Sequence, residues 1–286
     1  MRFACLIAAL LLSWSSVCRA APAICPEPPP YPADLGQWDR MAARAGTPEA
    51  RALMTYMMSA AIHQPQGPRG DVAALCRYRP ADAVLRATGK PVRMVFMGDS
   101  ITELWAQANP RLFAGGFVNR GIGGQLTWQM LVRFRQDVID LHPVSVHILG
   151  GTNDLVGMAG ATTLAETEGN IETMVELAQA HGIKVVLGAL PPMGPPWDSP
   201  ARRAELFALN AWLAETARHD GLGFADYYAV LADSTGALNT QLSIDSLHPN
   251  RFGFEEMEAL MRFALSDVEP ARKKARGSAP RTPLGP

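Results

Sequence analysis

The residues of this chain that are suited to chemistry lie where predicted strands end or a late helix begins. Ser100 follows Gly-Asp after the apolar run 92–97, and Asp245 and His248 stand three positions apart before the last predicted helix. A serine hydroxyl, a histidine that takes its proton and a carboxylate that orients the histidine together make an activated nucleophile. These residue types favour acyl transfer through a covalent intermediate.

Two further positions have groups that could stabilise a tetrahedral oxyanion, which needs hydrogen-bond donors. Gly124 follows the second predicted strand and Asn153 follows the third. Ligands of open parallel sheets bind at this edge. Each residue also has an ordinary structural explanation: Ser100 and Asn153 as helix caps, Gly124 and Asp245 as turn residues, and His248 as a surface histidine. Their joint order along the chain is harder to explain by structure alone.

Strands and helices alternate from residue 92 onward, which is typical of a parallel sheet covered by helices on both faces. The apolar runs are short and continuous, as expected for strands buried on both sides. Thr163 and Glu166 have the spacing of a capping box, which predicts a helix start. The predicted strands are 92–97, 117–119, 144–149, 183–190 and 223–226.

Composition indicates one soluble catalytic domain with appendages, since 286 residues with 48% hydrophobic and 19% charged content can bury a large core. The net charge of −1 conceals an asymmetry. The body between the signal and the tail has 19 basic and 25 acidic residues, and the segment 266–286 is basic. We therefore expect no nucleic-acid partner for the body and a disordered tail.

The N-terminus predicts a secretory signal peptide over 1–20, with cleavage after Ala20 or as late as Ala23. Arg2 precedes the apolar run 4–14, which is too short to span a bilayer, and small residues follow. The protein is therefore expected to be exported, periplasmic or secreted, with no transmembrane segment after signal removal. Residues 24–90 are interpreted as a Pro-rich lead-in and a helical cover, with helical spacing at 42–62 and a second short helix from Asp71.

Two cysteines remain after removal of the signal, Cys25 and Cys76. In an oxidising compartment they could form a disulfide, since two thiols are then able to pair. Two unpaired cysteines are the alternative, because sequence does not give the distance between the Cα atoms.

Four blocks in a fixed order resemble the SGNH or GDSL hydrolases. They are Gly-Asp-Ser at 98–100, Asn-Arg-Gly-Ile-Gly-Gly at 119–124, Gly-Thr-Asn-Asp at 151–154 and Asp-Ser-Leu-His-Pro at 245–249. The resemblance places a hydrolase domain at 91–265. Within the family, the second block and Leu-Gly-Ala-Leu-Pro at the exit of the fourth strand are most similar to the branch of platelet-activating-factor acetylhydrolases and related bacterial esterases.

The resemblance implies a three-layer α/β/α sandwich with a five-stranded parallel sheet, flavodoxin-like, to which the N-terminal helical extension is added. It implies Ser100 as nucleophile, His248 as base and Asp245 as the residue that orients the base. It also implies an oxyanion hole made by the backbone N–H groups of Ser100 and Gly124 and by the Asn153 side chain. No metal and no organic cofactor are implied.

One departure from that branch lies in the second block. Gln125 follows the last glycine where the branch often has Asp, which leaves the local hydrogen bonding open. A Gly-x-Ser-x-Gly elbow is also missing, because Thr102 occupies its last position, so the common α/β-hydrolase arrangement is not expected.

The function implied by the resemblance is cleavage of carboxylic esters of the lipase/esterase, lysophospholipase or acetyl-esterase type, with a small-molecule ester, acylated glycan or lipid as substrate. A glycan O-acyltransferase and a noncatalytic glycan- or lipid-binding module are the alternatives. The residues leave the acyl length and the oligomeric state open. Apolar side chains beside the blocks are candidates for the wall of a substrate pocket, namely Trp105, Leu155, Met158, Trp197 and Leu247.

Overall fold

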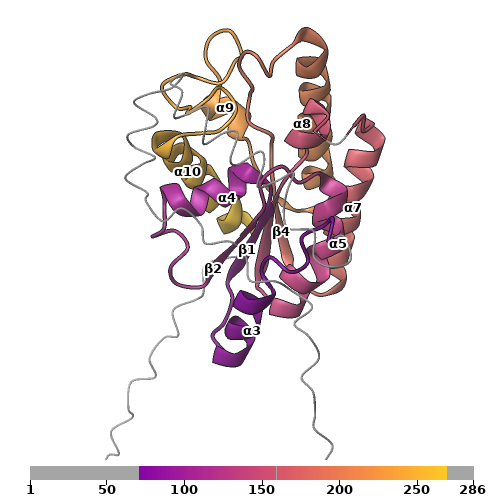
Figure 1. Ribbon diagram of the computed structural model, residues 1–286, viewed down its shortest axis with the longest axis vertical. Helices are drawn as coiled ribbons and strands as arrows, with labels where there is room; N and C mark the ends of the chain where they lie inside the picture. The colour runs from indigo at the N-terminus through magenta and orange to yellow at the C-terminus, as the bar shows by residue number, and fades with distance from the viewer. Residues whose placement is uncertain (1–70, 159, 269–286) are drawn as a thin grey trace, which may run out of the picture.

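A five-stranded parallel sheet forms the centre of the protein, which a computed structural model describes over residues 71–158 and 160–268 (Figure 1). The strand order is β2-β1-β3-β4-β5. The direction of winding changes between β1 and β3, and open sheets bind ligands at such a switch point. The strands are β1 (Met94–Gly98), β2 (Phe117–Gly121), β3 (Ser145–Leu149), β4 (Lys184–Gly188) and β5 (Gly223–Ala225).

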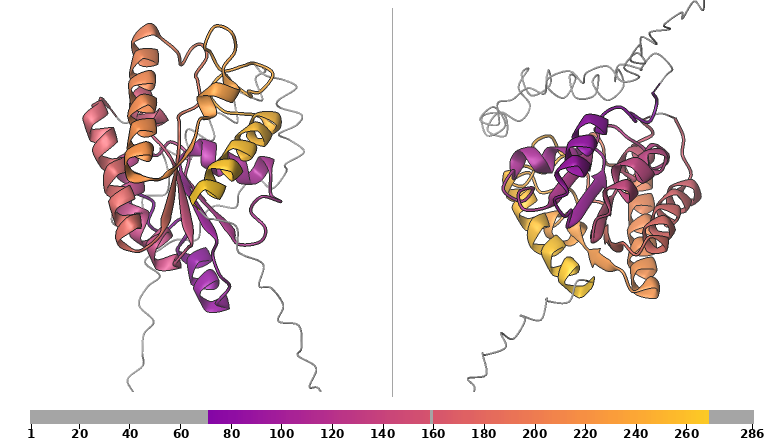
Figure 2. Two further views of the ribbon diagram at one scale, coloured as in Figure 1. Left: turned by 180° about the vertical axis from the view of Figure 1, so that it is seen from behind. Right: turned by 90° about the horizontal axis from the view of Figure 1, so that it is seen from below.

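Helices cover both faces of the sheet, so the predicted three-layer arrangement is confirmed (Figures 1 and 2). One face packs against α5 (Thr127–Asp137), α7 (Leu164–Ala180) and α8 (Pro200–Asp220). The other face packs against α4 (Ser100–Ala108) and α10 (Arg251–Val268). The remaining elements of the described part are α3 (Arg79–Thr88), η1 (Ile139–Leu141), α6 (Thr152–Val156) and α9 (Tyr227–Leu231).

The central strand β1 divides its side chains between the two helical layers. Val95 and Met97 pack in the cluster under α5, α7 and α8, whereas Met94 and Phe96 pack in the cluster under α4 and α10. All four are fully buried. Side chains alternate along a strand, and a strand covered on both faces is apolar on both. The continuous apolar run of β1 therefore places its carboxyl end, and Ser100 after it, between two packed layers.

Side-chain caps begin two of the helices on one face of the sheet, α7 and α8. The Thr163 side chain accepts a hydrogen bond from the Glu166 backbone N–H, and the Glu166 carboxylate accepts one from the Thr163 backbone N–H, so the predicted capping box is confirmed. The Ser199 hydroxyl caps α8 in the same way, ahead of a proline in its first turn. Caps satisfy backbone N–H groups that a helix leaves without intrahelical acceptors.

Most predicted boundaries differ from the structure by one or two residues, and two of the differences have a local cause. The helix expected from Asp71 begins only at Arg79, because the Asp71 carboxylate accepts hydrogen bonds from two backbone N–H groups in a turn, and a proline marks the true first helical turn. The second strand continues to Gly121, two residues beyond the predicted end, because these residues pair with Met97 and Gly98 of β1.

Several predictions concern residues outside the described ranges and stay predictions: the signal peptide, the Pro-rich lead-in, the helix at 42–62 and the basic tail. Cys76 is disulfide-bonded, and Cys25 lies outside the described residues, so their pairing also stays a prediction. No helix within the described ranges combines the length and apolar character needed to cross a membrane.

Two phenylalanines of α10 test the packing of the sheet face that α4 and α10 cover. Phe254 is 1% exposed and its ring stacks on Trp105, whereas Phe263 is 68% exposed. We expect Phe254→Ala to lower the free energy of unfolding by about 3–5 kcal/mol, because it leaves a cavity in the core. Phe263→Ala should change it by less than about 0.5 kcal/mol. Urea unfolding followed by circular dichroism measures both, and equal losses would contradict the described packing.

Candidate active site

Ser100, His248 and Asp245 form a continuous chain of hydrogen bonds at the carboxyl end of β1. Ser100 Oγ lies 2.9 Å from His248 Nε2, and His248 Nδ1 lies 2.7 Å from Asp245 Oδ2. The carboxylate fixes the proton on Nδ1, which leaves Nε2 as the acceptor for the serine hydroxyl. The structure thus brings together a hydroxyl, an imidazole and a carboxylate, the three side-chain groups that an acyl transfer of this kind uses.

A tight loop fixes the direction of the Asp245 carboxylate. Its Oδ1 accepts hydrogen bonds from the backbone N–H groups of Leu247 and His248, at 3.0 and 2.7 Å, so its Oδ2 is left to face the imidazole. The Ser243 hydroxyl accepts the Ser246 N–H at 2.8 Å and donates to the His248 carbonyl at 3.2 Å. The loop therefore holds acid and base in one rigid unit.

Ser100 is the first residue of α4, and the turn before it depends on Gly98. A Cβ at Gly98 would lie 2.0 Å from Thr102 Oγ1 and 2.7 Å from the Leu149 carbonyl oxygen, so a side chain does not fit. Asp99 caps the helix by accepting the Ile101 N–H at 2.9 Å. The close contact between strand end and helix start places the serine at the edge of the sheet.

Two backbone N–H groups stay candidates for oxyanion donors. Within residues 71–158 and 160–268, neither the Ser100 N–H nor the Gly124 N–H has a protein acceptor. Gly124 has a φ of 74° in a turn closed by the Gln125 N–H and the Ile122 carbonyl, 3.3 Å apart. Glycine adopts this left-handed conformation without strain. Both donors can therefore serve a ligand.

The Asn153 amide is held between the first and second blocks. Its Nδ2 donates to Asp99 Oδ2 at 3.2 Å and to the Gln125 carbonyl at 3.0 Å. A primary amide has two N–H bonds, and both have an acceptor here. Donation to an oxyanion therefore requires Asn153 to share or release one of these partners, and the bond to Asp99 is the longer.

Charges in the site favour a protonated imidazole. Burial lowers the pKa of His248, but the charge and hydrogen bond of Asp245 and the charge of Asp99 raise it above its ordinary 6.5. Burial raises the pKa of Asp245, and the charge and hydrogen bonds of His248 outweigh this and bring it below its ordinary value. Burial raises the pKa of Asp99 to about 6. Two carboxylates therefore stabilise an imidazolium at position 248.

The five expected pocket residues separate into two groups. Trp105 is fully buried in the core with Phe254 and His147, so the expectation that it lines the pocket is corrected: its indole faces the sheet. The other four lie in loops or short elements. Arg202 binds the backbone carbonyls of Leu155 and Trp197, which brings these two segments together. Leu247 is buried beside the triad, and Met158 is partly exposed; both stay pocket candidates.

Several polar residues that organise the site were not singled out from the sequence. Asp154 accepts hydrogen bonds from the Thr127 backbone and hydroxyl, at 3.1 and 2.8 Å, and so joins the third block to the start of α5. Glu103 accepts the Gly123 N–H at 2.7 Å. Asp154 belongs to a predicted block. Ser243 gives no signal because its partners are backbone groups, and Glu103 gives none because it binds the Gly123 backbone and an arginine 26 positions upstream. No metal-binding cluster of His, Cys, Asp or Glu occurs among the described residues.

Comparisons with known proteins agree with the fold and the blocks. A GDSL-like lipase from Bacteroides thetaiotaomicron is 38% identical, with a TM-score of 0.62 over 68% of this chain and 98% of that one. An acetylxylan esterase from Geobacillus stearothermophilus, 20% identical, shares the fold with a TM-score of 0.53 over 62% of this chain and 95% of that one. A lipoprotein of Bacillus subtilis is 34% identical over 73 residues, 24% of this chain and 30% of its own length.

The stretch of this chain that matches a known protein family includes both the first block and the last. The GDSL-like Lipase/Acylhydrolase family matches residues 96–255, which is more than half of the sequence and contains Ser100, Asn153 and His248. The solved lipase extends the agreement over nearly its whole length. The chain therefore belongs to the GDSL-like lipase/acylhydrolase family of carboxylic ester hydrolases.

Proposed function

We propose that this protein is an exported serine hydrolase that cleaves carboxylic esters through an acyl-enzyme on Ser100. The observation that carries the proposal is the hydrogen-bonded chain from Ser100 through His248 to Asp245. Family membership supports ester hydrolysis. Export rests on the predicted signal peptide, and the partial similarity to a lipoprotein supports it.

The reaction has two stages. In the first, Ser100 Oγ attacks the ester carbonyl carbon while its proton moves to His248 Nε2, and this proton then goes to the alcohol as the C–O bond breaks. In the second, water attacks the acyl-enzyme and gives a proton to Nε2, which returns it to Ser100 Oγ as the acid leaves. One water is consumed for each ester, and one acid and one alcohol are released.

Three donors stabilise the negative charge that develops on the carbonyl oxygen in both stages. The backbone N–H groups of Ser100 and Gly124 need no rearrangement, because neither has an acceptor in the described part of the chain. Asn153 joins them by releasing the longer of its two bonds, the 3.2 Å contact with Asp99. Preorganised donors of this kind supply much of the rate enhancement in acyl transfer.

Substrate size is the finer part of the proposal. Leu155, Trp197, Met158 and Leu247 are proposed to line an apolar wall that contacts the acyl group. One solved neighbour is an acetylxylan esterase and another is a GDSL-like lipase, so short acyl groups on glycans and longer acyl groups on lipids are the two substrate classes to compare. Release of acetate from acetylated xylan, measured beside release of fatty acid from lysophospholipid vesicles, decides between them.

Replacement of Ser100 tests the nucleophile. We expect Ser100→Ala to lower kcat on p-nitrophenyl acetate by at least about 10⁴-fold, because no other hydroxyl among the described residues is bound to the His248 imidazole, while the thermal unfolding midpoint stays near that of the wild type. A fluorophosphonate should label the wild type once per chain and leave the variant unlabelled. Ser234→Ala, at an exposed serine, is the matched control and should keep full activity. Full activity of Ser100→Ala would contradict the proposal.

The pH profile tests the base. Protonated His248 cannot take the serine proton, so kcat/KM should fall as the pH drops through an apparent pKa above 6.5. The ionised Asp99 carboxylate raises that pKa, so Asp99→Asn should move the acid limb to lower pH. The pH at the midpoint of the acid limb does not depend on the maximum rate. A shift of this midpoint therefore reports the charge of Asp99 even where kcat is lower. An acid limb that stays at the same pH, or moves to higher pH, would show that Asp99 does not raise the pKa of His248.

A further inference from the structure

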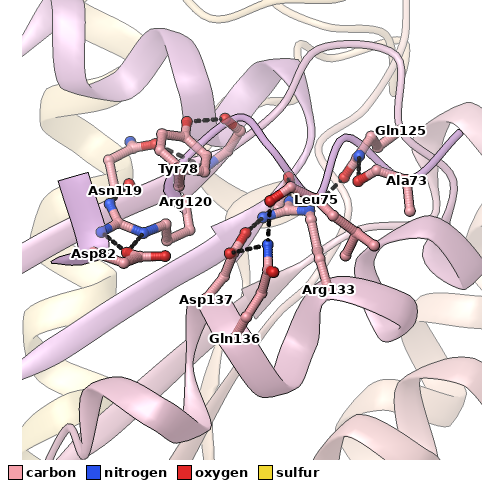
Figure 3. A network of polar contacts seen from close by, with 12 residues as sticks. Ala73, Leu75, Tyr78, Asp82, Asn119, Arg120, Gln125, Arg133, Gln136 and Asp137 are labelled. Carbon is pink, nitrogen blue, oxygen red and sulfur yellow. Dashed lines mark hydrogen bonds and ion pairs between the residues drawn. The ribbon is translucent and has the colours of Figure 1, made fainter. Parts of the chain in front are cut away.

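Gln125 is buried, and each end of its side-chain amide has a partner (Figure 3). Its Oε1 accepts a hydrogen bond from Arg133 Nε at 2.6 Å, and its Nε2 donates to the Ala73 carbonyl at 2.9 Å. Its own backbone carbonyl accepts from Asn153 Nδ2 at 3.0 Å. Gln125 therefore connects Asn153 with residues 71–82, which we call the anchoring segment.

Arg133 connects the same loop with the strand that leads to Ser100. Its side chain has no exposed surface, and its three nitrogens bind Gln125 Oε1, Asp137 Oδ2 and the Gly98 carbonyl. The contact with Gly98 is 3.0 Å, and the ion pair with Asp137 is 2.9 Å. Asp137 balances the buried charge, as a fully buried guanidinium requires. One cation thus fixes the end of β1 relative to the second block.

The anchoring segment contacts the second block at two more points. The Tyr78 hydroxyl donates to the Gly121 carbonyl (Figure 3). Arg77 pairs with Glu103 Oε1 at 3.1 Å, and Glu103 Oε2 accepts the Gly123 N–H at 2.7 Å. The segment therefore supports the backbone at Gly121 directly and at Gly123 through Glu103, in addition to the Gln125 side chain.

Glutamine suits position 125 because its amide both accepts and donates. A carboxylate at the same place could accept from Arg133 but could not donate to the Ala73 carbonyl. The branch that this chain resembles often has aspartate in this position, and the aspartate side chain is also one methylene shorter than that of glutamine. Gln125, the residue that departs from that branch, therefore has a hydrogen-bond partner in the anchoring segment. This segment lies upstream of the hydrolase domain that is expected from the sequence.

We propose that Gln125 and Arg133 are positioning residues, which hold the Gly124 N–H and the Asn153 amide at the reacting carbonyl with the anchoring segment as their support. The inference rests on the proposed function. Oxyanion donors act over hydrogen-bond distances of about 2.7–3.1 Å, and a misplacement of about 1 Å can cost roughly 100-fold in rate. Loss of the Gln125 side chain therefore acts on kcat rather than on substrate binding.

The test compares Gln125→Ala and Gln125→Glu with the control Gln136→Ala in the full-length protein. Gln136 Nε2 also donates to a carbonyl of the anchoring segment, that of Leu75 at 2.7 Å, and to Asp137 Oδ1 at 2.9 Å, but Gln136 binds neither Gln125 nor the second block, and Asp137 keeps its other oxygen on Arg133. We expect Gln125→Ala to lower kcat on p-nitrophenyl acetate by about 10- to 100-fold with KM within about threefold. Gln125→Glu keeps the contact with Arg133, so its kcat should fall less than that of Gln125→Ala. Gln136→Ala should keep kcat within about threefold.

Active-site titration keeps the outcomes distinct. Each kcat is divided by the fraction of chains that a fluorophosphonate labels at completion, so molecules that fail to fold do not count. Wild-type kcat in Gln125→Ala, or an equal loss in Gln136→Ala, would overturn the positioning role. A wild-type protein that takes up no label and hydrolyses no ester would instead overturn the proposed function.

Discussion

A polar group that is buried at the carboxyl edge of the sheet is stabilised by a partner inside the protein, because an unpaired buried group costs about 1–3 kcal/mol. Asp99, Asn153 and Arg133 are each 5% exposed or less, and each is hydrogen-bonded to a residue of another block or to the strand end. Because these partners belong to different segments, satisfying them fixes the segments relative to one another. The rigidity of the site is thus a consequence of burial.

Two buried histidines show how the same residue type acquires opposite properties. His147 on β3 binds the Tyr227 hydroxyl at 2.8 Å, and burial lowers its pKa to about 3. His248 is also buried, but Asp245 and Asp99 raise its pKa. His147 therefore stays neutral and packs in the core, whereas His248 can accept a proton. The carboxylate partner, and not burial, distinguishes a base from a core residue.

The fold, and the meeting of Ser100, His248 and Asp245 at the sheet edge, could be predicted from sequence, because apolar runs, caps and short blocks are local signals. The rest depends on tertiary contacts. Trp105 is apolar and follows Ser100 by about one and a half helical turns, so its sequence position fits a pocket wall and the core equally, and only packing against Phe254 decides. The role of Gln125 depends on the Ala73 carbonyl, 52 positions away, and a backbone carbonyl leaves no mark in a sequence.

Asp99 has two effects on the proposed reaction that at first oppose each other. As an anion beside Asn153, it competes for the donor that the oxyanion needs and repels the charge that forms there. The same negative charge, however, raises the pKa of His248. Because the oxyanion and the imidazolium form together when the serine proton moves, the repulsion of one is offset by the attraction of the other. A buried carboxylate next to the nucleophile is therefore compatible with catalysis, provided that the base and the oxyanion both lie within its field.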